Sequence, residues 1–361
     1  DNVTHEIMGS ASVMTTHDHP MGVSAGVIEA FKNCLTMNKI NSDDVIFIAH
    51  STTQATNALL EGDVAEVGIL GMGRGGLEGF LAKRQTKIEN INLGTGKIIK
   101  VFHTFLKEKE LNESSIEQAL ENLAGQGAGV VVASKAFGVD NITEEELVHT
   151  VAEKHGIPVT IASEISKLYG LTRRTRTAAI NASILPKMLD TANSTELSVR
   201  QAGIKVPLMI MRGDGGVMNI DEMKKRPVLT MLSGPAASVV GALMYLRASN
   251  GVYFEVGGTS TNIGVIKNGR PTVDYSIVGG HSTYINSLDV RVLGIAGGSM
   301  VRASKEGIID VGPRSAHIAG MGYAVYTPEE EIVNPQIELF SPKKGDPADY
   351  VAIRLENGKR I

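Results

Sequence analysis

Apolar segments of two kinds alternate along roughly the first 215 residues of the chain. Short apolar runs bounded by glycine, proline or polar residues are typical of buried strands. Longer segments in which apolar residues recur every three or four positions are typical of amphipathic helices. The alternation predicts helices layered on a sheet, an α/β fold. The expected strands are 44–49, 64–70, 97–104, 129–133, 158–162 and 206–211, and the expected helices are 22–37, 53–60, 115–123, 144–155 and 178–192.

The segment Gly251–Asp274 reads GVYFEVGGTSTNIGVIKNGRPTVD and predicts three strands joined by two turns. The second turn is Asn268-Gly269, the strongest short-range hairpin signal, because both central residues of its usual turn take positive φ. The paired glycines Gly257 and Gly258 therefore lie in a turn between two strands. This arrangement differs from a Walker loop, whose GxxxxGK[ST] pattern the chain lacks.

The first turn carries groups that suit a phosphate. Adjacent glycines let backbone N–H groups approach an anion closely, and neighbouring hydroxyls add donors. Glu255, near the end of the preceding strand, could reach a phosphate-bound Mg²⁺ through water. The candidate phosphate-binding residues are Gly257, Gly258, Thr259, Ser260 and Thr261. An ordinary glycine-rich hairpin is the alternative.

Composition and charge narrow the classes of function. A chain of 361 residues can hold two domains with buried cores. Its net charge of −4, without a basic stripe, argues against a nucleic-acid partner. No apolar run approaches the roughly 18 to 20 residues of a membrane span, so no membrane association is expected. The single cysteine, Cys34, excludes an intrachain disulfide and fits a reducing cytoplasm.

The segment EVGGTSTNIGVI (255–266) resembles the second phosphate loop of the actin-like ATPase superfamily, in the form carried by hydantoinase/oxoprolinase proteins. The chain departs from that family's pattern at Glu255 and Asn262, where the family carries aspartates. Asn262 lacks the charge that the family's aspartate brings to this loop. Further segments resemble family motifs in the same order: HSTTQATNALLEG (50–62), TRRTRTAAINASILPKM (172–188), IMRGDGGVM (210–218), LSGPAASVVGA (232–242), LGIAGGSMVRA (293–303) and VGPRSAHIAGMGY (311–323).

The resemblance implies a two-lobe actin-like, ribonuclease H-like ATPase fold. We expect an N-terminal hydantoinase/oxoprolinase-type region over 1–186 as lobe 1, and a hydantoinase A-type region over 187–361. Ser233 and Pro235 suit a helix start, and the small residues that follow suit close packing, so we expect a hinge at about 232–246 before lobe 2. Family members place a first phosphate-loop strand ahead of residue 1. We therefore expect the chain to be a fragment that lacks it.

The resemblance also implies four catalytic candidates: Glu255, Asp214, His50 and Arg174. His50 ends an apolar strand before a helix, where polar groups can bind an anion or a substrate carbonyl. Arg174 matches a family arginine and could bind a substrate carboxylate. Asp214 and Glu255 are the candidates for holding Mg²⁺.

Three of these candidates have a structural alternative. Ser51 or Thr52 could simply cap the helix beside His50. At least two of Arg173, Arg174 and Arg176 could be solvated surface charges, and Asp214 could belong to a plain Asp-Gly turn.

The residues Gly297, Gly298 and Ser299 resemble the glycines that hold adenosine in actin-like ATPases, and we expect them to line the nucleotide or substrate cleft.

The implied function is ATP- and Mg²⁺-dependent opening of a cyclic amide of the 5-oxoproline or hydantoin type, through phosphoryl activation of the ring carbonyl. The family usually works with a hydantoinase B-type subunit or domain, so an oligomer with such a partner is expected. One alternative is a subunit of an ATP-dependent ketone carboxylase. A second is a non-catalytic actin-like activator or reactivase of a partner enzyme.

Overall fold

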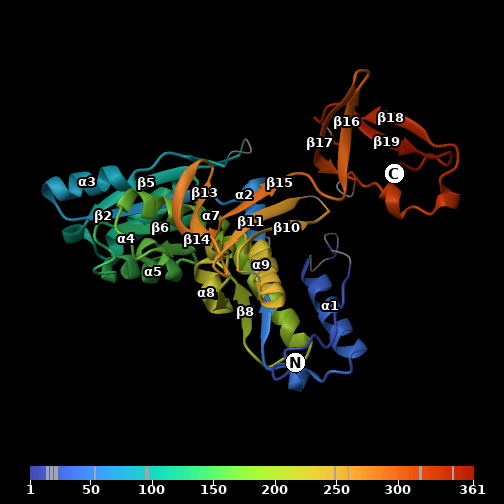
Figure 1. Cartoon of the computed structure of the whole chain (residues 1–361). Helices are drawn as coiled ribbons and strands as arrows, with labels where there is room; N and C mark the ends of the chain where they lie inside the picture. Colours follow the sequence, from blue (N-terminus) through green and yellow to red (C-terminus); the bar gives the residue numbers. More distant parts are fainter. Residues whose placement is uncertain are drawn as a thin grey trace. The chain divides into compact units, whose positions relative to one another are not determined.

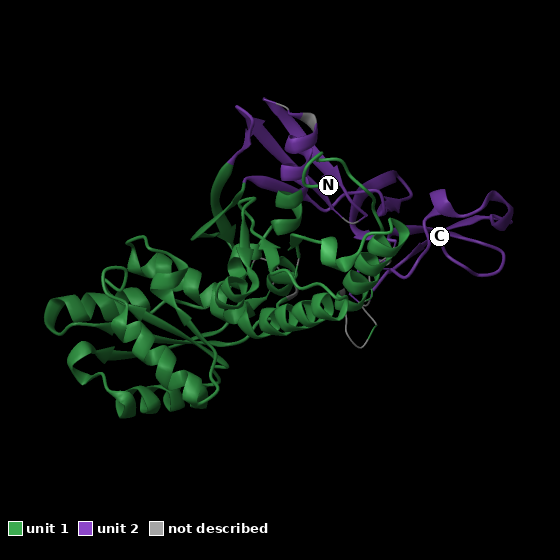
Figure 2. Ribbon diagram, turned by 90° about the horizontal axis from the view of Figure 1, so that it is seen from below, with its two compact units in different colours: residues 1–237, 273–288 green, residues 238–272, 289–361 purple. Residues whose placement is uncertain are grey.

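The computed structural model describes residues 1–13, 16, 19, 23–52, 54–93, 97–247, 249–258, 260–316, 319–343 and 345–361. The chain forms two compact units (Figure 2), unit 1 from 1–237 and 273–288, and unit 2 from 238–272 and 289–361. The sequence-based division at residue 186 differs from this one, because Pro186 lies inside a continuous helix, α7 (Leu171–Gln201). The chain instead passes between the units within α9 (Ser233–Leu246), inside the segment predicted as a hinge.

Unit 1 contains a parallel sheet with the strand order β5-β2-β6-β7. Its central strands β2 and β6 are buried along their whole length, as expected for a parallel sheet covered on both faces. The strands are β2 (Val67–Gly73), β5 (Val101–Lys107), β6 (Val130–Lys135) and β7 (Val159–Ile161), and the connecting helices are α3 (Gly76–Thr86), α4 (Glu113–Gln126) and α5 (Thr143–Lys154).

Alternating side chains of β6 separate two layers of core. Val131 and Ala133 pack with residues of α4 and α5, which lie side by side in Figure 1. Val130 and Val132 face the other way and share a core with α7. This two-sided burial follows from the period of two along a strand. The α/β prediction is therefore confirmed in unit 1.

A smaller sheet of unit 1 has the order β1-β8-β9, with β1 and β8 parallel and β8 and β9 antiparallel. A β13–β14 hairpin packs on α7, and β3 pairs with β4. The strands are β1 (Ile48–His50), β3 (Ile91–Asn92), β4 (Ile98–Ile99), β8 (Leu208–Met211), β9 (Val217–Asn219), β13 (Val273–Val278) and β14 (His281–Leu288). The remaining α-helices are α1 (Val23–Met37), α2 (Gln54–Glu61), α6 (Ala162–Ile165) and α8 (Ile220–Lys225). Unit 1 also has 3-10 helices at Ser42–Asp44, Glu108–Glu110 and Pro227–Thr230.

Among its described residues, unit 2 holds the end of α9 and two antiparallel sheets. In the first, β11 (Thr261–Lys267) lies between β10 (Gly251–Val256) and β15 (Val290–Leu293), and also pairs with β12 (Arg270–Pro271). The second has the order β17-β16-β19-β18, formed by β16 (Ser299–Ser304), β17 (Gly307–Ser315), β18 (Gln336–Phe340) and β19 (Tyr350–Arg354). Unit 2 has 3-10 helices at Ala324–Tyr326 and Glu329–Glu331.

The helix α3 was not among the predicted elements. Its buried positions are small residues or a threonine, Gly79, Ala82 and Thr86, whereas Leu77 and Phe80 are exposed. A helix with large apolar residues on its outer side lacks the periodic signal that a helix prediction needs. Among the described residues, none of the helices has the length and apolar character to span a membrane.

Candidate functional site

The predicted strand–turn–strand is present in unit 2. β10 and β11 are antiparallel, with Glu255 opposite Asn262 and Val256 opposite Thr261, so the paired glycines occupy the turn between them. Asn268 and Gly269 both have positive φ (51° and 71°), which confirms the second turn as the type that the sequence predicts. The glycine turn is exposed to solvent at Gly257 and Gly258.

The structure brings together the two glycine pairs, which lie about 40 residues apart in the sequence. The N–H of Gly297 donates to the carbonyl oxygen of Gly257 at 3.1 Å, and the N–H of Gly298 donates to that of Gly258 at 2.9 Å. A Cβ on Gly298 would lie 2.7 Å from the Gly258 oxygen and 2.4 Å from the Tyr323 ring. Glycine is required at 298 because this approach leaves no room for a side chain.

A cavity of about 280 Å³ adjoins the second glycine pair. Its lining includes Gly297, Gly298, Ser299 and Tyr323. Tyr323 was not assigned a role from the sequence, although it ends the last family-like motif. The signal that could have identified it is its position as an aromatic residue at the end of a glycine-rich segment.

Several polar groups of the turn are engaged within unit 2 itself. The N–H of Gly257 donates to the carbonyl oxygen of Ser260, and the Thr261 hydroxyl donates to that of Ile295 at 2.6 Å. The Ser299 hydroxyl oxygen accepts from the Ala296 N–H at 2.8 Å. The Gly257 N–H and the Thr261 hydroxyl thus hold the loop in shape, which is a different use from the free phosphate donors that the sequence predicts, whereas the accepting Ser299 hydroxyl still has its proton to donate. Thr259, another predicted donor, lies outside the described residues.

Glu255 is exposed, and one carboxylate oxygen accepts from the Asn262 side-chain amide at 3.2 Å. Its neighbour on the same face of β10 is Tyr253, because alternate residues of a strand share a face. Burial, followed by the negative charges of Asp289 and Glu255, raises the pKa of Tyr253 to about 12. The described residues hold no group of three or more His, Cys, Asp or Glu side chains placed to bind a metal ion. An Mg²⁺ ion there would therefore need ligands from phosphate and water beside Glu255, which is a common arrangement for this ion.

His50 lies where the sequence predicts, at the carboxyl end of β1 and opposite Ile210 of the parallel strand β8. Burial lowers its pKa, so the imidazole is neutral at pH 7. The loop after His50 meets the start of α9: the Ser233 hydroxyl donates to the Thr52 carbonyl oxygen and accepts from the Thr52 N–H. Two helix N-termini, those of α2 and α9, thus converge beside the carboxyl ends of two parallel strands, a common place for ligands in α/β proteins.

Asp214 is held by its own turn. One carboxylate oxygen pairs with the Arg212 guanidinium, and the other accepts from the Gly216 N–H at 3.0 Å. The intervening Gly213 is tightly enclosed, because a Cβ there would lie 1.9 Å from the Met231 carbonyl oxygen. Both oxygens of Asp214 are occupied, so this residue fits a metal less well than Glu255 does.

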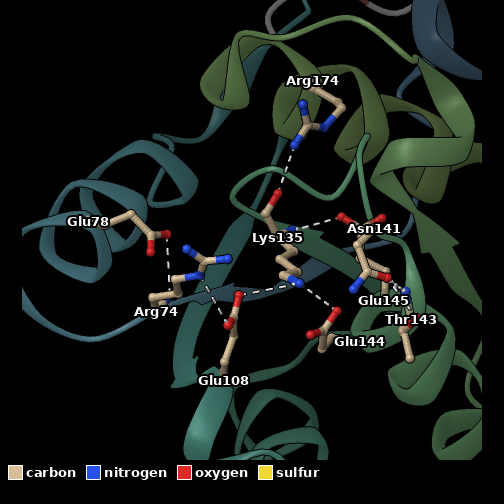
Figure 3. Close-up of polar contacts among 9 residues, drawn as sticks. All are labelled: Arg74, Glu78, Glu108, Lys135, Asn141, Thr143, Glu144, Glu145 and Arg174. Atoms are coloured by element: carbon tan, nitrogen blue, oxygen red, sulfur yellow. Dashed lines mark hydrogen bonds and ion pairs between the residues drawn. The ribbon is translucent and has the colours of Figure 1, made fainter.

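Arg174 is buried, which differs from the alternative of solvated surface charges; neither Arg173 nor Arg176 is fully exposed. Its guanidinium donates to the Lys135 carbonyl oxygen at 2.8 Å (Figure 3) and to the Leu168 carbonyl oxygen at 3.1 Å. Arg173 donates to the Thr283 carbonyl oxygen, and its guanidinium lies over the rings of Tyr275 and Tyr284. Arg174, the predicted substrate-binding arginine, therefore uses two of its donor groups to bind backbone carbonyl oxygens of the protein itself.

A charged cluster that the sequence did not reveal lies at the carboxyl edge of the parallel sheet (Figure 3). The buried ammonium group of Lys135 lies 2.6 Å from Glu144 and 3.3 Å from Glu108. Glu145 accepts from the Lys135 N–H at 2.8 Å and from the Ser163 N–H at 2.9 Å, and burial raises its pKa. The available signal was a lysine at the end of an otherwise apolar strand, but Glu144 and Glu145 follow it only at the start of the next helix, and Glu108 precedes the helix before the strand.

Known proteins resemble this chain in sequence and in structure. The profile of the hydantoinase/oxoprolinase N-terminal region matches residues 2–156, and the hydantoinase/oxoprolinase profile matches residues 174–331. The chain is 27% identical to 5-oxoprolinase of Saccharomyces cerevisiae over 64% of this chain and 18% of that protein. It is 26% identical to caprolactamase subunit alpha of Pseudomonas jessenii over 57% of this chain and 30% of that protein.

A solved structure supports the α/β fold. Nucleotide-free acetone carboxylase superposes with a TM-score of 0.62 and 20% identity, over 82% of this chain and 47% of that chain. The chain spans about a third or less of the length of the curated relatives it matches. The two profile matches account for most of its residues, and they include both glycine pairs described above. The chain therefore belongs to the hydantoinase/oxoprolinase family.

Proposed function

We propose that this chain is the nucleotide-binding part of an ATP-dependent enzyme that opens a cyclic amide of the 5-oxoproline or hydantoin type. The observation that carries the proposal is the pairing of the two glycine segments by the hydrogen bonds from Gly297 to Gly257 and from Gly298 to Gly258. This pairing puts an exposed turn beside a cavity of about 280 Å³. An exposed turn that begins with two glycines lets phosphate oxygens approach the backbone closely.

The residues of the site have distinct proposed roles. Gly258 and Ser260 contact phosphate oxygens, while Gly298 and Tyr323 shape the wall of the adjoining cavity. Glu255 holds Mg²⁺ through water, with Asp214 as the second, weaker candidate. ATP supplies the phosphoryl group that makes the ring carbonyl electrophilic enough for water to attack. His50, neutral at pH 7, is the candidate for contacting the substrate carbonyl.

We propose an actin-like two-lobe arrangement with α9 as its hinge, since the chain passes between its two compact units within that helix. A hydantoinase B-type partner and an oligomeric enzyme are part of the proposal. They are supported by a relative that is named as the alpha subunit of a caprolactamase. A cytoplasmic location is supported by the single, unpaired Cys34.

The test has two stages, because nucleotide binding and turnover are separable. In the first, the purified chain is titrated with ATP and Mg²⁺ by calorimetry, and we expect saturable binding that Gly298→Ala abolishes. In the second, the enzyme assembled with its partner subunit is given ATP with 5-oxoproline, hydantoin or caprolactam. We expect ADP release coupled to ring opening. Glu255→Gln should lower kcat by about 100-fold, a loss typical of removing one strong electrostatic contact, and Glu306→Gln serves as the exposed control.

Three outcomes would contradict the proposal in different ways. Absence of ATP binding would remove the nucleotide site. ATP consumption that depends on a ketone and bicarbonate would favour the carboxylase. Nucleotide-dependent association with a partner, without turnover of any lactam, would favour the non-catalytic activator.

A further inference from the structure

The outer face of α3 is apolar although it meets solvent. Leu77, Phe80 and Leu81 are 75%, 64% and 45% exposed. Their spacing of three and four residues puts them on one side of the helix. The side chains that face the protein are small: a Cβ on Gly73 of β2 would lie 2.8 Å from the Ala82 Cβ, so α3 lies close against that strand. The usual amphipathic pattern of a surface helix is therefore reversed in α3.

The charges around this outer face have one sign. Lys83 and Arg84 belong to α3, Lys87 follows it, and all three are exposed. None of the three forms an ion pair with another described residue. The acidic residue of the helix, Glu78, turns towards the loop before it: its Oε1 accepts from the Arg74 N–H at 3.3 Å (Figure 3), and its Oε2 is buried. α3 thus presents large apolar side chains beside cations, on a chain whose net charge is −4.

A cavity of about 480 Å³ adjoins the end of this face. Gln85, one helical turn after Leu81, lines the cavity, and Phe137 and Tyr169 supply aromatic walls that are themselves exposed. The surface therefore combines protruding apolar side chains with an aromatic-lined hollow. Anchoring side chains that fill such hollows contribute most of the affinity of many protein interfaces.

The charges indicate which kind of partner fits this surface. A second copy of the chain, docked face to face, would bring Lys83, Arg84 and Lys87 close to the same cations of the other copy, and like charges oppose such a contact. A lipid surface offers anions to the cations but no shaped group to the hollow. A protein that carries carboxylates around apolar side chains complements both the cations and the hollow.

We propose that the outer face of α3, formed by Leu77, Phe80, Leu81 and Arg84 with the adjoining hollow, docks the partner subunit through a surface of apolar side chains ringed by carboxylates. Exposed apolar clusters with a polar rim are typical of protein–protein sites. The inference rests on the proposed function, because it gives the hydantoinase B-type partner a place on this chain. The docking face lies in unit 1 and the proposed nucleotide site lies in unit 2, so the two can be tested separately.

The experiment measures binding of the purified hydantoinase B-type subunit to the full chain by calorimetry. We expect saturable binding by the wild-type chain, weakened at least about 30-fold by Phe80→Ser, as for a central anchor of an interface. Arg84→Glu should weaken binding at least about tenfold, because it places a carboxylate opposite carboxylates. The controls are Leu197→Ser, at an exposed leucine of α7, and Lys32→Glu, at an exposed lysine of α1, and each should change the Kd by less than about twofold.

A titration of the same variants with ATP and Mg²⁺ separates this inference from the proposed nucleotide site. Both α3 variants should bind ATP as the wild-type chain does, and their circular dichroism should be unchanged, since the substituted side chains are exposed. Wild-type affinity for the partner in both α3 variants would overturn the inference and leave the proposed partner in place. Absence of partner binding by the wild-type chain would overturn the inference together with the proposed partner, while ATP binding would still stand.

Two further measurements test the other occupants of this face. Sedimentation velocity of the chain alone reports self-association, and flotation with vesicles of phosphatidylserine and phosphatidylcholine reports membrane binding. We expect neither. Self-association or vesicle binding that Phe80→Ser abolishes would overturn the inference in favour of a second copy or of a lipid surface.

Discussion

The hydroxyl of Ser233 donates a hydrogen bond to the Thr52 carbonyl oxygen at 2.8 Å and accepts one from the Thr52 N–H at 3.2 Å. The two residues are 181 positions apart and both are buried. The sequence predicts Ser233 as a helix cap, yet its hydroxyl joins the start of α9 to the loop after β1. These two hydrogen bonds fix the N-terminal end of α9, the predicted hinge helix, to the loop that follows β1 in the smaller sheet of unit 1.

Replacing Ser233 by alanine leaves the Thr52 N–H and carbonyl group buried without this partner. We expect the free energy of unfolding to fall by about 1–3 kcal/mol, the cost of leaving buried polar groups unsatisfied. Chemical denaturation measures the change. Ser238→Ala, at an exposed position of the same helix, should change stability by less than about 0.5 kcal/mol. Equal effects of the two substitutions would contradict the assigned role of the Ser233 hydroxyl.

Replacing Gly298 by alanine forces a Cβ against the Tyr323 ring and the Gly258 carbonyl oxygen. The contact between the two glycine pairs must then open, and we expect a loss of about 1–3 kcal/mol in the stability of unit 2. Thermal unfolding and hydrogen exchange at Gly297 and Gly298 report it. Gly251→Ala is the matched control, because a Cβ there meets no other atom within 4 Å. Retained protection of both amides in Gly298→Ala would show that the turns do not depend on this approach.

The pKa of His103 is lowered to about 4, first by burial and then by the charges of Lys87 and Lys83. The unfolded chain binds the proton near pH 6.5, so stability due to this group is present above pH 6.5 and is lost as the pH falls towards 4. Allowing for its partial exposure, we expect a loss of about 1–2 kcal/mol across that range, absent in His103→Gln.

The neutral form of His103 can also be assigned. The Thr86 hydroxyl lies 2.9 Å from the Ala82 carbonyl oxygen, to which it donates, so His103 Nε2, 3.0 Å from the same hydroxyl oxygen, must carry the proton. A pH titration followed by NMR of the ring nitrogens measures both the pKa of His103 and which nitrogen carries the proton in the neutral ring. A titration midpoint above pH 6, or a protonated Nδ1 in the neutral ring, would contradict the predicted environment.

Removing the Arg174 guanidinium leaves the Lys135 and Leu168 carbonyl oxygens without their hydrogen-bond donor. It also leaves the buried Glu145 without a neighbouring positive charge. We expect Arg174→Met to lower the free energy of unfolding by about 3 kcal/mol, as when one partner is removed from buried charges. The exposed Arg74 pairs with Glu108 at 3.7 Å, and Arg74→Met should cost less than about 1 kcal/mol. Denaturation of both variants provides the comparison. Unchanged stability in Arg174→Met would contradict the structural role assigned to this guanidinium.

Local signals in the sequence were sufficient for much of the secondary structure. The Asn268-Gly269 turn follows from two adjacent residues that tolerate positive φ, and the buried strands β2 and β6 follow from runs of apolar residues. The helix α3 was missed because its apolar side chains do not share one buried face. Periodicity reports an element only when one side of it is consistently buried.

The sequence by itself determined the α/β layers, the hairpin that carries Gly257 and Gly258, and the family motifs. Only the tertiary structure decided that Gly298 lies against Gly258, that Arg174 is buried on backbone carbonyl oxygens, and that Lys135 meets three glutamates. The physical reason is the distance along the chain over which each kind of interaction acts. Backbone preferences and periodicity act over a few residues, whereas these contacts join segments that only the packing of the whole chain brings together.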